Sequence, residues 1–408
     1  MNILLLANKL PYPARDGGSL ATLNMASGLA DCGCTVTLLA VNTSKHYFPV
    51  EQIPGTVAAK IRFRTALADT RIMPFRLLRN LLFSRYPYNA ERFISEKILT
   101  VLGQILDEQT FDVIQLEGPY LFYCLPIIRK KSGALISLRA HNIEHEIWMR
   151  NALYSRNYFT RIYFRLLSGR IKKLETDLLN SVDALIPISG RDASVFASSG
   201  VLCPVHTATF GLNVSDYQVT SLPPVFSLFF LGALDWRPNA EGLEWFINHA
   251  WPLIKTRFPE TRFYIAGRNA GRYYRKESRD KNIILVGEVD DARRFMSEHT
   301  AMIVPLLAGS GIRVKILEGM AMRRAVITTN TGLEGIDAHD GQEVLIANDP
   351  DAFISAISKL EGNPELQMTI GSNARKFVIE NFDNLAVCQG LVNFYNEQLR
   401  WSGKSSSG

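Results

Sequence analysis

Residues 302–323 read MIVPLLAGSGIRVKILEGMAMR. The apolar run Met302–Leu306 predicts a buried strand, and the spacing of apolar residues over Val314–Met322 predicts a helix after it. Gly309 and Gly311 let backbone amides approach an anion closely, and the start of the helix adds free N–H groups and the positive end of the helix dipole. The stretch therefore predicts a strand, a loop and a helix with an anion site beyond the end of the strand.

The charged residues of the same stretch favour an anionic ligand that contains a ribose. Arg313 and Lys315 place two cations at the helix N-terminus, where positive charge is unfavourable for the helix, so a bound anion would explain them. Glu318 follows within the first turns, where its carboxylate can accept hydrogen bonds from ribose hydroxyls. The alternative is a glycine-containing loop before a surface helix whose Arg and Lys side chains are solvated.

The same rhythm of short apolar runs and helical segments extends along the whole chain. Apolar runs of this length with little polar alternation suit a parallel sheet covered on both faces. Strand–helix alternation twice over predicts an α/β protein with two doubly wound, Rossmann-like domains. The predicted strands are Asn2–Ala7, Thr35–Val41, Asp112–Leu116, Ala134–Arg139, Asp183–Ile188, Leu228–Leu234, Phe263–Ala266, Ile283–Val286, Met302–Leu306, Ala325–Thr328 and Val344–Ala347. The predicted helices include Leu20–Leu29, Phe93–Leu106, Arg161–Leu179, Ala240–Ile254, Val314–Met322, Pro364–Glu380 and Leu385–Leu399.

Composition shifts suggest where the domains meet. We expect an N-terminal domain over residues 1–212, a linker rich in proline and polar residues over 213–226, and a C-terminal domain over 227–381. Residues 382–400 predict a C-terminal helix that packs back toward the N-terminal domain, and 401–408 predict a disordered tail. Two doubly wound domains would face each other across a cleft, with ligands beyond the carboxyl ends of the strands.

The composition describes a globular protein with an uneven charge. The chain has 408 residues and a net charge of +6. Residues 1–212 hold 24 Lys and Arg against 16 Asp and Glu, whereas 213–408 hold 21 against 23. We expect a reduced, cytoplasmic location, at most peripheral on the inner face of the membrane, because no apolar run could span a bilayer and the start of the chain lacks a secretory signal pattern. The five cysteines are scattered at Cys32, Cys34, Cys124, Cys203 and Cys388.

Two more loops carry residues suited to an anion. The segment Leu231–Leu243, LGALDWRPNAEGL, follows a predicted strand, and Arg237 should stand just outside the helix that begins there. The alternative for Arg237 is a capping or surface role. The segment Asn8–Leu20, NKLPYPARDGGSL, runs through Gly17 and Gly18 directly into a helix, which suits a phosphate or sugar hydroxyl, although a plain flexible loop with an N-cap serine explains it equally well.

A polar cluster also follows a predicted strand in the segment Ser137–Trp148, SLRAHNIEHEIW. His141 is the candidate for a catalytic role, Asn142 and Glu144 are candidates for contact with a substrate, and His145 is better explained as structural. The spacing does not match HExxH, and no Asp-x-Asp pair follows a suitable strand, so we expect no metal site. A satisfied structural histidine is the alternative for His141.

The order of these motifs resembles a known family. The sequences WRPN, GSGIRVKILE and GLEGI (residues 332–336), behind the N-terminal DGGS, resemble retaining glycosyltransferases of family four, which have the GT-B fold. The resemblance covers essentially the whole chain and is strongest over residues 228–350. Glu334, within GLEGI, could point into the cleft or could belong to a plain turn.

The resemblance implies a nucleotide-diphosphate sugar as donor in the second domain. Arg237 and the cations of residues 309–318 would bind the diphosphate, Glu318 the ribose, and the backbone around Gly267–Arg268 and Gly287–Val289 the base. The family usually has a second glutamate eight positions before the ribose glutamate, and Ser310 stands there in this chain. No cofactor besides the donor is implied.

The implied mechanism is front-face attack with retention of configuration, in which the leaving phosphate takes the proton of the acceptor and no metal is needed. His141, Arg237 and Lys315 would be the catalytic residues, and Asn142 and Glu144 would contact the acceptor. The full set of predicted donor-binding residues is Gly17, Gly18, Arg237, Gly267, Arg268, Val289, Ser310, Gly311, Arg313, Lys315, Glu318 and Glu334.

Two basic segments of the first half suggest a further partner. Residues 147–174 hold seven Arg and Lys and no acidic residue, with aromatic residues interleaved, and residues 60–92 hold eight basic residues against two acidic ones. This pattern favours an anionic membrane surface. A solvated or interdomain face is the alternative, and we expect no nucleic acid because no recognition motif accompanies the charge.

The expected reaction is the transfer of a sugar to a hydroxyl of a sugar, a lipid-linked molecule or a protein, in cell-surface polysaccharide or glycoconjugate biosynthesis. Two other functions fit the same motifs. A sugar-nucleotide epimerase would need catalytic carboxylates and no second substrate. A non-catalytic nucleotide-sugar-binding protein is the other, and Ser310 favours it slightly.

Overall fold

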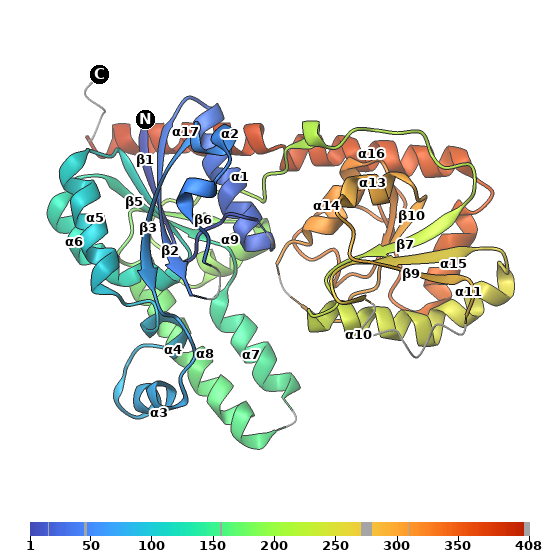
Figure 1. Ribbon diagram of the computed structural model, residues 1–408, viewed down its shortest axis with the longest axis horizontal. Coiled ribbons are helices and arrows are strands. Elements are labelled where there is room, and N and C mark those ends of the chain that lie inside the picture. Colours follow the sequence, from blue (N-terminus) through green and yellow to red (C-terminus); the bar gives the residue numbers. More distant parts are fainter. Residues whose placement is uncertain (15, 45–46, 156, 271–279, 310, 404–408) are drawn as a thin grey trace. The chain divides into compact units, whose positions relative to one another are not determined.

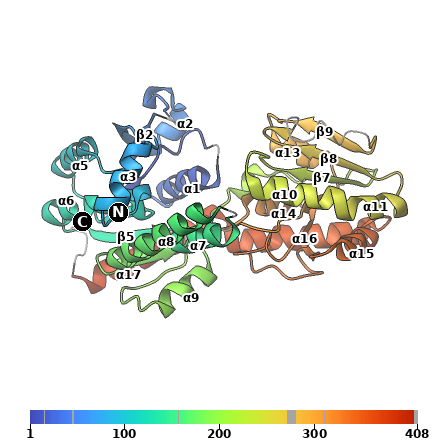
Figure 2. The same ribbon diagram turned by 90° about the horizontal axis from the view of Figure 1, so that it is seen from below.

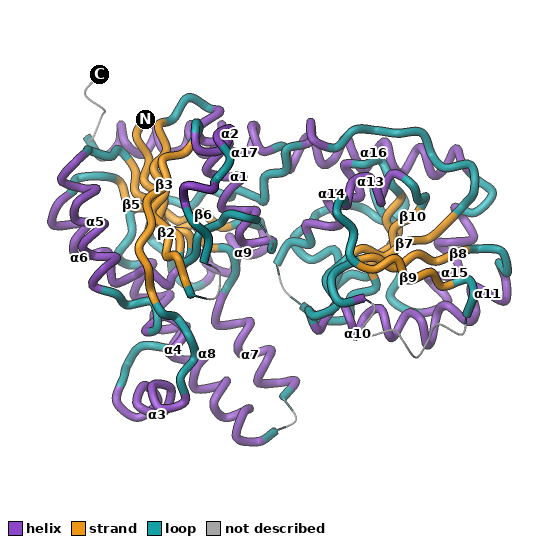
Figure 3. The backbone as a smooth tube through the Cα atoms, in the orientation of Figure 1, coloured by secondary structure: helices purple, strands orange, loops and turns teal. Residues whose placement is uncertain are grey.

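The computed structural model describes the chain except for residues 15, 45–46, 156, 271–279, 310 and 404–408. The chain divides into two compact units, one formed by Met1–Gly211 with Asn384–Gly408 and the other by Leu212–Asp383. Each unit contains a six-stranded parallel sheet between helices (Figures 1 and 3). The two doubly wound α/β sheets expected from the sequence are therefore confirmed.

The sheet of the first unit has the strand order β3-β2-β1-β4-β5-β6. Its central strand is apolar on both sides, because Leu4 and Leu6 pack into one core while Ile3 and Leu5 pack into another on the opposite face. The strands are β1 Asn2–Ala7, β2 Thr35–Thr43, β3 Ile61–Ala68, β4 Val113–Glu117, β5 Leu135–Ala140 and β6 Ala184–Pro187. The helices are α1 Gly17–Asp31, α2 Gly55–Ala58, α3 Pro74–Phe83, α4 Tyr88–Glu91, α5 Glu96–Glu108, α6 Leu125–Lys131, α7 Glu144–Tyr154, α8 Tyr158–Leu179, α9 Gly190–Ser198 and α17 Asn384–Trp401, with the 3₁₀ turns η1 Val50–Gln52 and η2 Pro119–Cys124.

The last helix, α17, belongs to the first unit and packs on α1. The amide of Asn384 donates to the carbonyl of Asn24 at 2.8 Å, and Gly28 lies so close to α17 that a Cβ there would be 2.5 Å from the Cys388 sulfur. Figure 2 shows α17 in a second view, and its Leu391 and Tyr395 share a core with Met25 of α1 on the face of the sheet opposite to the core that contains Leu178 of α8. The unit thus combines the two ends of the chain, with its boundaries at Gly211 and Asn384.

The sheet of the second unit has the order β12-β11-β10-β7-β8-β9 and is buried on both faces, with Phe230 and Ile303 in a large apolar core and the alternate residues Phe229 and Met302 also fully buried. The strands are β7 Ser227–Leu231, β8 Arg262–Ala266, β9 Ile283–Gly287, β10 Ala301–Val304, β11 Ala325–Thr328 and β12 Leu345–Ile346. The helices are α10 Arg237–Trp245, α11 Trp251–Arg257, α13 Ala292–Ser297, α14 Val314–Ala321, α15 Pro350–Leu360 and α16 Pro364–Phe382, with the 3₁₀ turn η3 Val214–Asp216 and the π-helical turn η4 Phe246–Ala250.

Two elements differ from the sequence predictions. Strand β3 was not predicted, because it is an edge strand whose exposed positions include Arg62 and Arg64. The helix predicted over Ala240–Ile254 consists of three pieces, since Pro252 has no N–H to donate and the chain passes through η4 before α11. Helix α10 also begins earlier than predicted, at Arg237, so this residue is the first of the helix and not outside it.

In the part of the chain that the structure describes, no helix is long and apolar enough to cross a membrane.

Candidate active site

The second unit brings together the loops after β7 and β10, as the sequence predicted. The ammonium of Lys315, in the first turn of α14, donates to Oδ1 of Asn239 at 2.6 Å and lies 4.4 Å from the ring centre of Phe230. The amide of Asn239 in turn donates to the carbonyl of Ala233 at 2.9 Å. The ammonium is therefore fixed beside Gly232, just past the end of β7, where a Cβ on the glycine would lie 2.9 Å from it.

The environment of Lys315 favours loss of its proton. Burial lowers the pKa of the ammonium, the nearby charge of Arg313 lowers it further, and Glu318 opposes both, which leaves a pKa of about 7. An anion placed beside the ammonium would raise this pKa again, because an opposite charge stabilises the protonated form. Binding of a diphosphate and protonation of Lys315 are thus expected to be coupled.

Arg313 reaches across to the loop after β7. Its side chain is buried, its guanidinium lies 5.6 Å from the ring centre of Trp236, and Nη1 donates to the carbonyl of Gly311 at 2.5 Å. Gly309 has a φ of 128°, and a Cβ there would lie 2.7 Å from Nη2 of Arg313. Glycine at 309 thus leaves the space that the guanidinium occupies. Ser310, the position of the missing family glutamate, lies outside the described residues.

Glu318 is bound by a tyrosine that the sequence analysis missed. The phenol of Tyr217 donates to Oε1 of Glu318 at 2.8 Å. Burial raises the pKa of Glu318, while the Tyr217 hydrogen bond and the charges of Arg293 and Lys315 lower it, and the net direction is upward. Burial and the neighbouring carboxylate also raise the pKa of Tyr217, so its hydroxyl remains a donor. The phenol therefore fixes the orientation of the carboxylate proposed to bind ribose.

The predicted base-binding segments follow β8 and β9. Gly267, at a φ of 139°, donates its N–H to the carbonyl of Gly287 at 2.7 Å, and a Cβ at 267 would lie only 2.0 Å from the carbonyl oxygen of Gly232. Only a residue without a side chain fits this crossing of two loops. Arg268 pairs with Asp235 at 3.0 Å, which ties the loop after β8 to the loop after β7.

Three other predicted donor residues lie in less constrained positions. The side chain of Arg237 is 79% exposed and pairs with Glu241 at 2.6 Å, one turn along α10. Val289 is partly buried in the loop after β9, and Glu334 is partly buried in the turn after β11. The side chains that converge on the end of β7 are thus those of α14 and of Asn239 and Trp236, whereas that of Arg237 turns to solvent.

His141 lies in the first unit, directly after β5, and its partner is a buried carboxylate. Nε2 of His141 donates to Oε2 of Glu117 at 2.7 Å. The same oxygen accepts from Arg139 at 3.2 Å and from Thr22 at 3.1 Å, and Gln115 donates to Oε1. Burial raises the pKa of Glu117, but the Arg139 charge and the His141 hydrogen bond outweigh it and hold this pKa at about 2.

The consequence of this network is a fixed imidazole. Because Glu117 stays ionised, it accepts a hydrogen bond from Nε2–H of His141, and this bond sets the orientation of the ring. Nδ1 is then the ring nitrogen left to interact with a substrate. Glu117 and Arg139 were not identified from the sequence. The position of Glu117 as the last residue of an apolar strand could have indicated a functional role.

Glu144, predicted to contact the acceptor, is the first residue of α7 and already has a partner. Its carboxylate accepts from the phenol of Tyr120 at 2.7 Å, and burial, reinforced by the nearby charge of Glu175, raises its pKa to about 7. Glu175 accepts from the backbone N–H of Glu144 at 2.8 Å and binds Nδ1 of His145 at 2.6 Å, so it caps α7. Asn142, in the turn before α7, is partly buried.

The glycines of the first loop begin α1, but an internal carboxylate occupies the end of the helix. Asp16 accepts from the backbone N–H of Ser19 at 3.0 Å and binds Lys9 at 2.7 Å. Gly17 and Gly18 follow this N-cap directly. A ligand anion at the same backbone N–H groups would compete with the carboxylate of Asp16, and Asp16, not serine, is the cap.

Within the described ranges, no group of three or more His, Cys, Asp or Glu side chains is arranged to hold a metal ion.

One comparison with known proteins covers part of the second unit, and the others cover nearly the whole chain. Residues 225–363 match the family model described as glycosyl transferases group 1. A curated protein from Klebsiella pneumoniae, named "Uncharacterized 44.6 kDa protein in cps region", is 25% identical over 414 residues, covering 95% of this chain and 98% of that protein.

Solved structures align over nearly the whole chain. Sucrose-phosphate synthase from Thermosynechococcus elongatus is 14% identical with a TM-score of 0.70, covering 98% of this chain and 100% of that one. Anabaena HepE in complex with UDP is 13% identical with a TM-score of 0.66, covering 97% and 100%. The chain has the GT-B fold. The group 1 match lies within the second unit and contains Arg313, Lys315 and Glu318, the residues that the sequence predicted to bind the diphosphate and the ribose.

Proposed function

We propose that the protein is a retaining glycosyltransferase that moves a sugar from a nucleoside-diphosphate sugar to a hydroxyl acceptor. The observation that carries this proposal is the placement of two cations at the start of α14, with the Lys315 ammonium beside Gly232 just past β7 and the Arg313 guanidinium beside Gly309 and Trp236. The group 1 match over residues 225–363 supports it. Solved structures of the similar HepE contain UDP and UDP-glucose, which makes a UDP-sugar the first donor to test.

In this reaction the diphosphate leaves with negative charge, and fixed cations stabilise that charge without reorganisation. Lys315 and Arg313 supply two cations and the N-terminus of α14 adds backbone donors. Glu318 accepts hydrogen bonds from the ribose. We assign to His141, oriented by Glu117, a hydrogen bond to the donor sugar, and to the leaving phosphate the role of taking the acceptor proton, so that the two cations act without a metal ion.

The test is binding and turnover of nucleotide sugars by the full chain. UDP-, GDP- and ADP-sugars are compared by thermal shift, and the preferred donor is then assayed for hydrolysis and for transfer to added acceptors. Lys315→Met and Arg313→Met should each weaken donor binding at least tenfold, because each removes a charged contact to the diphosphate. The matched control is Lys359→Met, which removes an exposed lysine on α15 in the same unit.

The outcomes separate the alternatives. Unchanged donor binding in Lys315→Met would overturn the donor site. Turnover of the donor sugar into an isomer with no acceptor present would indicate an epimerase, and binding with neither hydrolysis nor transfer would indicate a non-catalytic protein.

We further propose that the first unit docks on an anionic membrane, and that the enzyme acts in polysaccharide or glycoconjugate biosynthesis in the cytoplasm. The name of the Klebsiella relative, which places it in a cps region, supports the second point. The first rests on α3 and on the adjoining ends of α7 and α8, which expose apolar side chains among Arg residues. The apolar residues are Phe75, Leu78, Leu82, Phe83, Leu153, Tyr154, Tyr158 and Phe159.

The arrangement of α3, α7 and α8 is better suited to contact with a membrane surface than to burial in the core of the first unit. Figure 1 shows α3, α7 and α8 extending away from the strands of the first unit, with α7 and α8 side by side. Arg170 of α8 donates to the carbonyls of Asn80 and Leu81 at 3.2 and 2.8 Å, which attaches α3 to α8. Helix α3 contains Arg76 and Arg79 and no acidic residue, so its apolar face and its charge both complement an anionic bilayer.

A further inference from the structure

The first unit contains a pocket that neither the donor site nor His141 accounts for. It has a volume of about 710 Å³ and lies where the loops after β1, β2 and β3 meet the start of the segment after α4. This is the carboxyl edge of a doubly wound sheet, the edge at which such sheets bind ligands. On the proposed function, the donor occupies the second unit, so this pocket is the candidate site for the acceptor.

The lining of the pocket is cationic. It includes Lys9, Arg71 and Arg92, and none of the lining residues that the structure describes is acidic. Lys9 is paired with Asp16 at 2.7 Å, and Arg71 is paired with Asp69 at 2.7 Å. Carboxylates therefore already neutralise part of the charge of Lys9 and Arg71, and the third cation of the pocket is Arg92.

The side chain of Arg92 makes no hydrogen bond or ion pair with the described part of the chain. Its guanidinium lies 5.0 Å from the ring centre of Phe93, and its Nε is buried without a hydrogen-bond partner. A buried guanidinium donor that lacks a partner costs free energy, which a bound anion would recover. Of the three cations in this pocket, Arg92 is thus the one whose side chain would gain most from a hydrogen bond to a bound anion.

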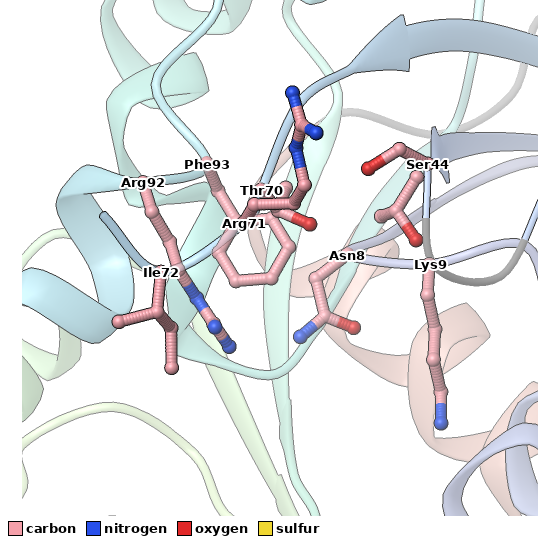
Figure 4. Close-up of a pocket in the computed structure, with 9 residues that line it drawn as sticks. Asn8, Lys9, Ser44, Thr70, Arg71, Ile72, Arg92 and Phe93 are labelled. Carbon is pink, nitrogen blue, oxygen red and sulfur yellow. The ribbon is translucent and has the colours of Figure 1, made fainter.

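The guanidinium of Arg92 shares one side of the pocket with two other donors. In Figure 4 the guanidinium of Arg92, the amide of Asn8 and the ammonium of Lys9 extend toward the same side of the pocket, whereas Arg71 turns to the other side. A guanidinium offers several donors in a planar fork that matches a phosphate, and a lysine adds a compact charge. This set suits a phosphate or diphosphate group.

The edge of the pocket is apolar. Ile72 lines the pocket and is 66% exposed, and it is followed by Met73 and by Phe75 of α3, both exposed. The anion site therefore opens directly onto the surface proposed to meet the membrane. A free sugar phosphate would leave this apolar edge unused.

We infer that the acceptor is a sugar joined through a phosphate or diphosphate to a lipid, with Arg92 binding the phosphate and Ile72 contacting the lipid. This inference rests on the proposed function only for calling the molecule an acceptor. The binding of an amphiphilic phosphate in the first unit stands on the pocket itself.

The experiment measures binding of three probes to the full chain: farnesyl diphosphate, inorganic pyrophosphate and farnesol. The donor site is blocked with saturating UDP, and the series is repeated in Lys315→Met, so that a diphosphate bound in the second unit does not contribute. We expect farnesyl diphosphate to bind at least tenfold more tightly than either other probe. Arg92→Gln should weaken it at least tenfold, and Arg92→Lys should have an intermediate effect, because the charge remains and the fork is lost.

The matched control is Arg62→Gln, which removes the same charge from the other end of β3 and should leave binding unchanged. Equal binding of farnesyl diphosphate to wild type and Arg92→Gln would overturn the phosphate site. If pyrophosphate bound as tightly as farnesyl diphosphate, the inferred lipid contact would be overturned. If farnesol bound as tightly as farnesyl diphosphate, the inferred phosphate contact would be overturned. Binding through Arg92 by a chain that binds no nucleotide sugar would refute the proposed function and leave this pocket standing.

Discussion

The phenol of Tyr217 and the carboxylate of Glu318 are joined by a 2.8 Å hydrogen bond between residues 101 positions apart. Tyr217 follows η3, in the segment that enters the second unit, and Glu318 lies on α14 beside Lys315. The bond uses Oε1, so we assign Oε2 to the ribose of the donor. Glu318 should therefore discriminate between a ribose and a deoxyribose, and Tyr217 should sharpen that discrimination.

We predict that Glu318→Gln weakens UDP binding about tenfold or more, because a hydrogen bond to a charged group is worth about 1.5–3 kcal/mol. Tyr217→Phe should cost less, about 0.5–1.5 kcal/mol, since it removes one neutral donor and leaves the carboxylate. Calorimetric titration with UDP and with 2′-deoxy-UDP measures both effects. Equal preference for UDP over its deoxy analogue in wild type and in Glu318→Gln would contradict the assignment.

The pKa of Lys315 predicts that the protein takes up a proton when it binds UDP at high pH. Its pKa of about 7 means that much of the protein carries a neutral amine at pH 8, and a bound diphosphate should restore the charge. We expect UDP binding to take up a proton at pH 8 and almost none at pH 6, where the ammonium is already formed. Calorimetry in buffers with different ionisation enthalpies measures the number of protons taken up per UDP bound.

The matched variant for this measurement is Lys315→Arg. An arginine stays charged at both pH values, so proton uptake should disappear while binding is largely kept. Uptake that persists in this variant would show that another group titrates.

Glu117 leads to a prediction about stability. Its pKa of about 2 lies below that of an ordinary glutamate, near 4.3, so its stabilising effect is complete above that ordinary value and is lost as the pH falls toward about 2. Glu117→Gln should lower the free energy of unfolding by about 3–5 kcal/mol at pH 7, because it leaves Arg139 charged and buried without its partner.

Urea unfolding between pH 7 and pH 2.5 tests this effect. The difference between wild type and Glu117→Gln should shrink as the pH falls, whereas Asp177→Asn, at an exposed carboxylate on α8, should change stability little at any pH. A difference that stays constant with pH would mean that the variant acts through packing and not through the ion pair.

Much of the fold and part of the site could be predicted because the relevant signals are local. Apolar runs in the order of a doubly wound sheet predicted both sheets, and the segments 231–243 and 306–323 each combine a strand end with polar or charged residues. Parallel strands end at one edge, so these segments had to share it. Lys315 and Asn239 meet there.

The missed residues depend on contacts that no local pattern encodes. Tyr217 lies in a polar stretch that looked like a linker, and its partner Glu318 is known only once α14 is packed. Glu117 is identified as the partner of His141 only when β4 and β5 are paired. The exposed position of Arg237 could have been predicted from the sequence, because Glu241 stands four residues further along the helix, at the spacing of a surface ion pair.

The apolar face of α3 leads to a prediction about membranes. Phe75 is 77% exposed and Leu78 is 55% exposed, beside Arg76 and Arg79 on the same helix. Insertion of such side chains contributes apolar burial, and each nearby arginine contributes about 1 kcal/mol of attraction to an anionic surface at low salt. We expect the full chain to float with vesicles of phosphatidylglycerol and phosphatidylcholine, less with pure phosphatidylcholine, and less at high salt.

The double variant Phe75→Ser with Leu78→Ser should lower the fraction bound at least tenfold at limiting lipid. The matched control is Leu202→Ser, since Leu202 is 92% exposed in the first unit but lies in the loop after α9. UDP binding by the double variant should equal that of wild type, because the proposed donor site lies in the second unit. Failure of wild type to float with anionic vesicles even at low salt would refute membrane docking, and equal loss in the Leu202 variant would show that exposure alone, and not the basic face of α3, decides binding.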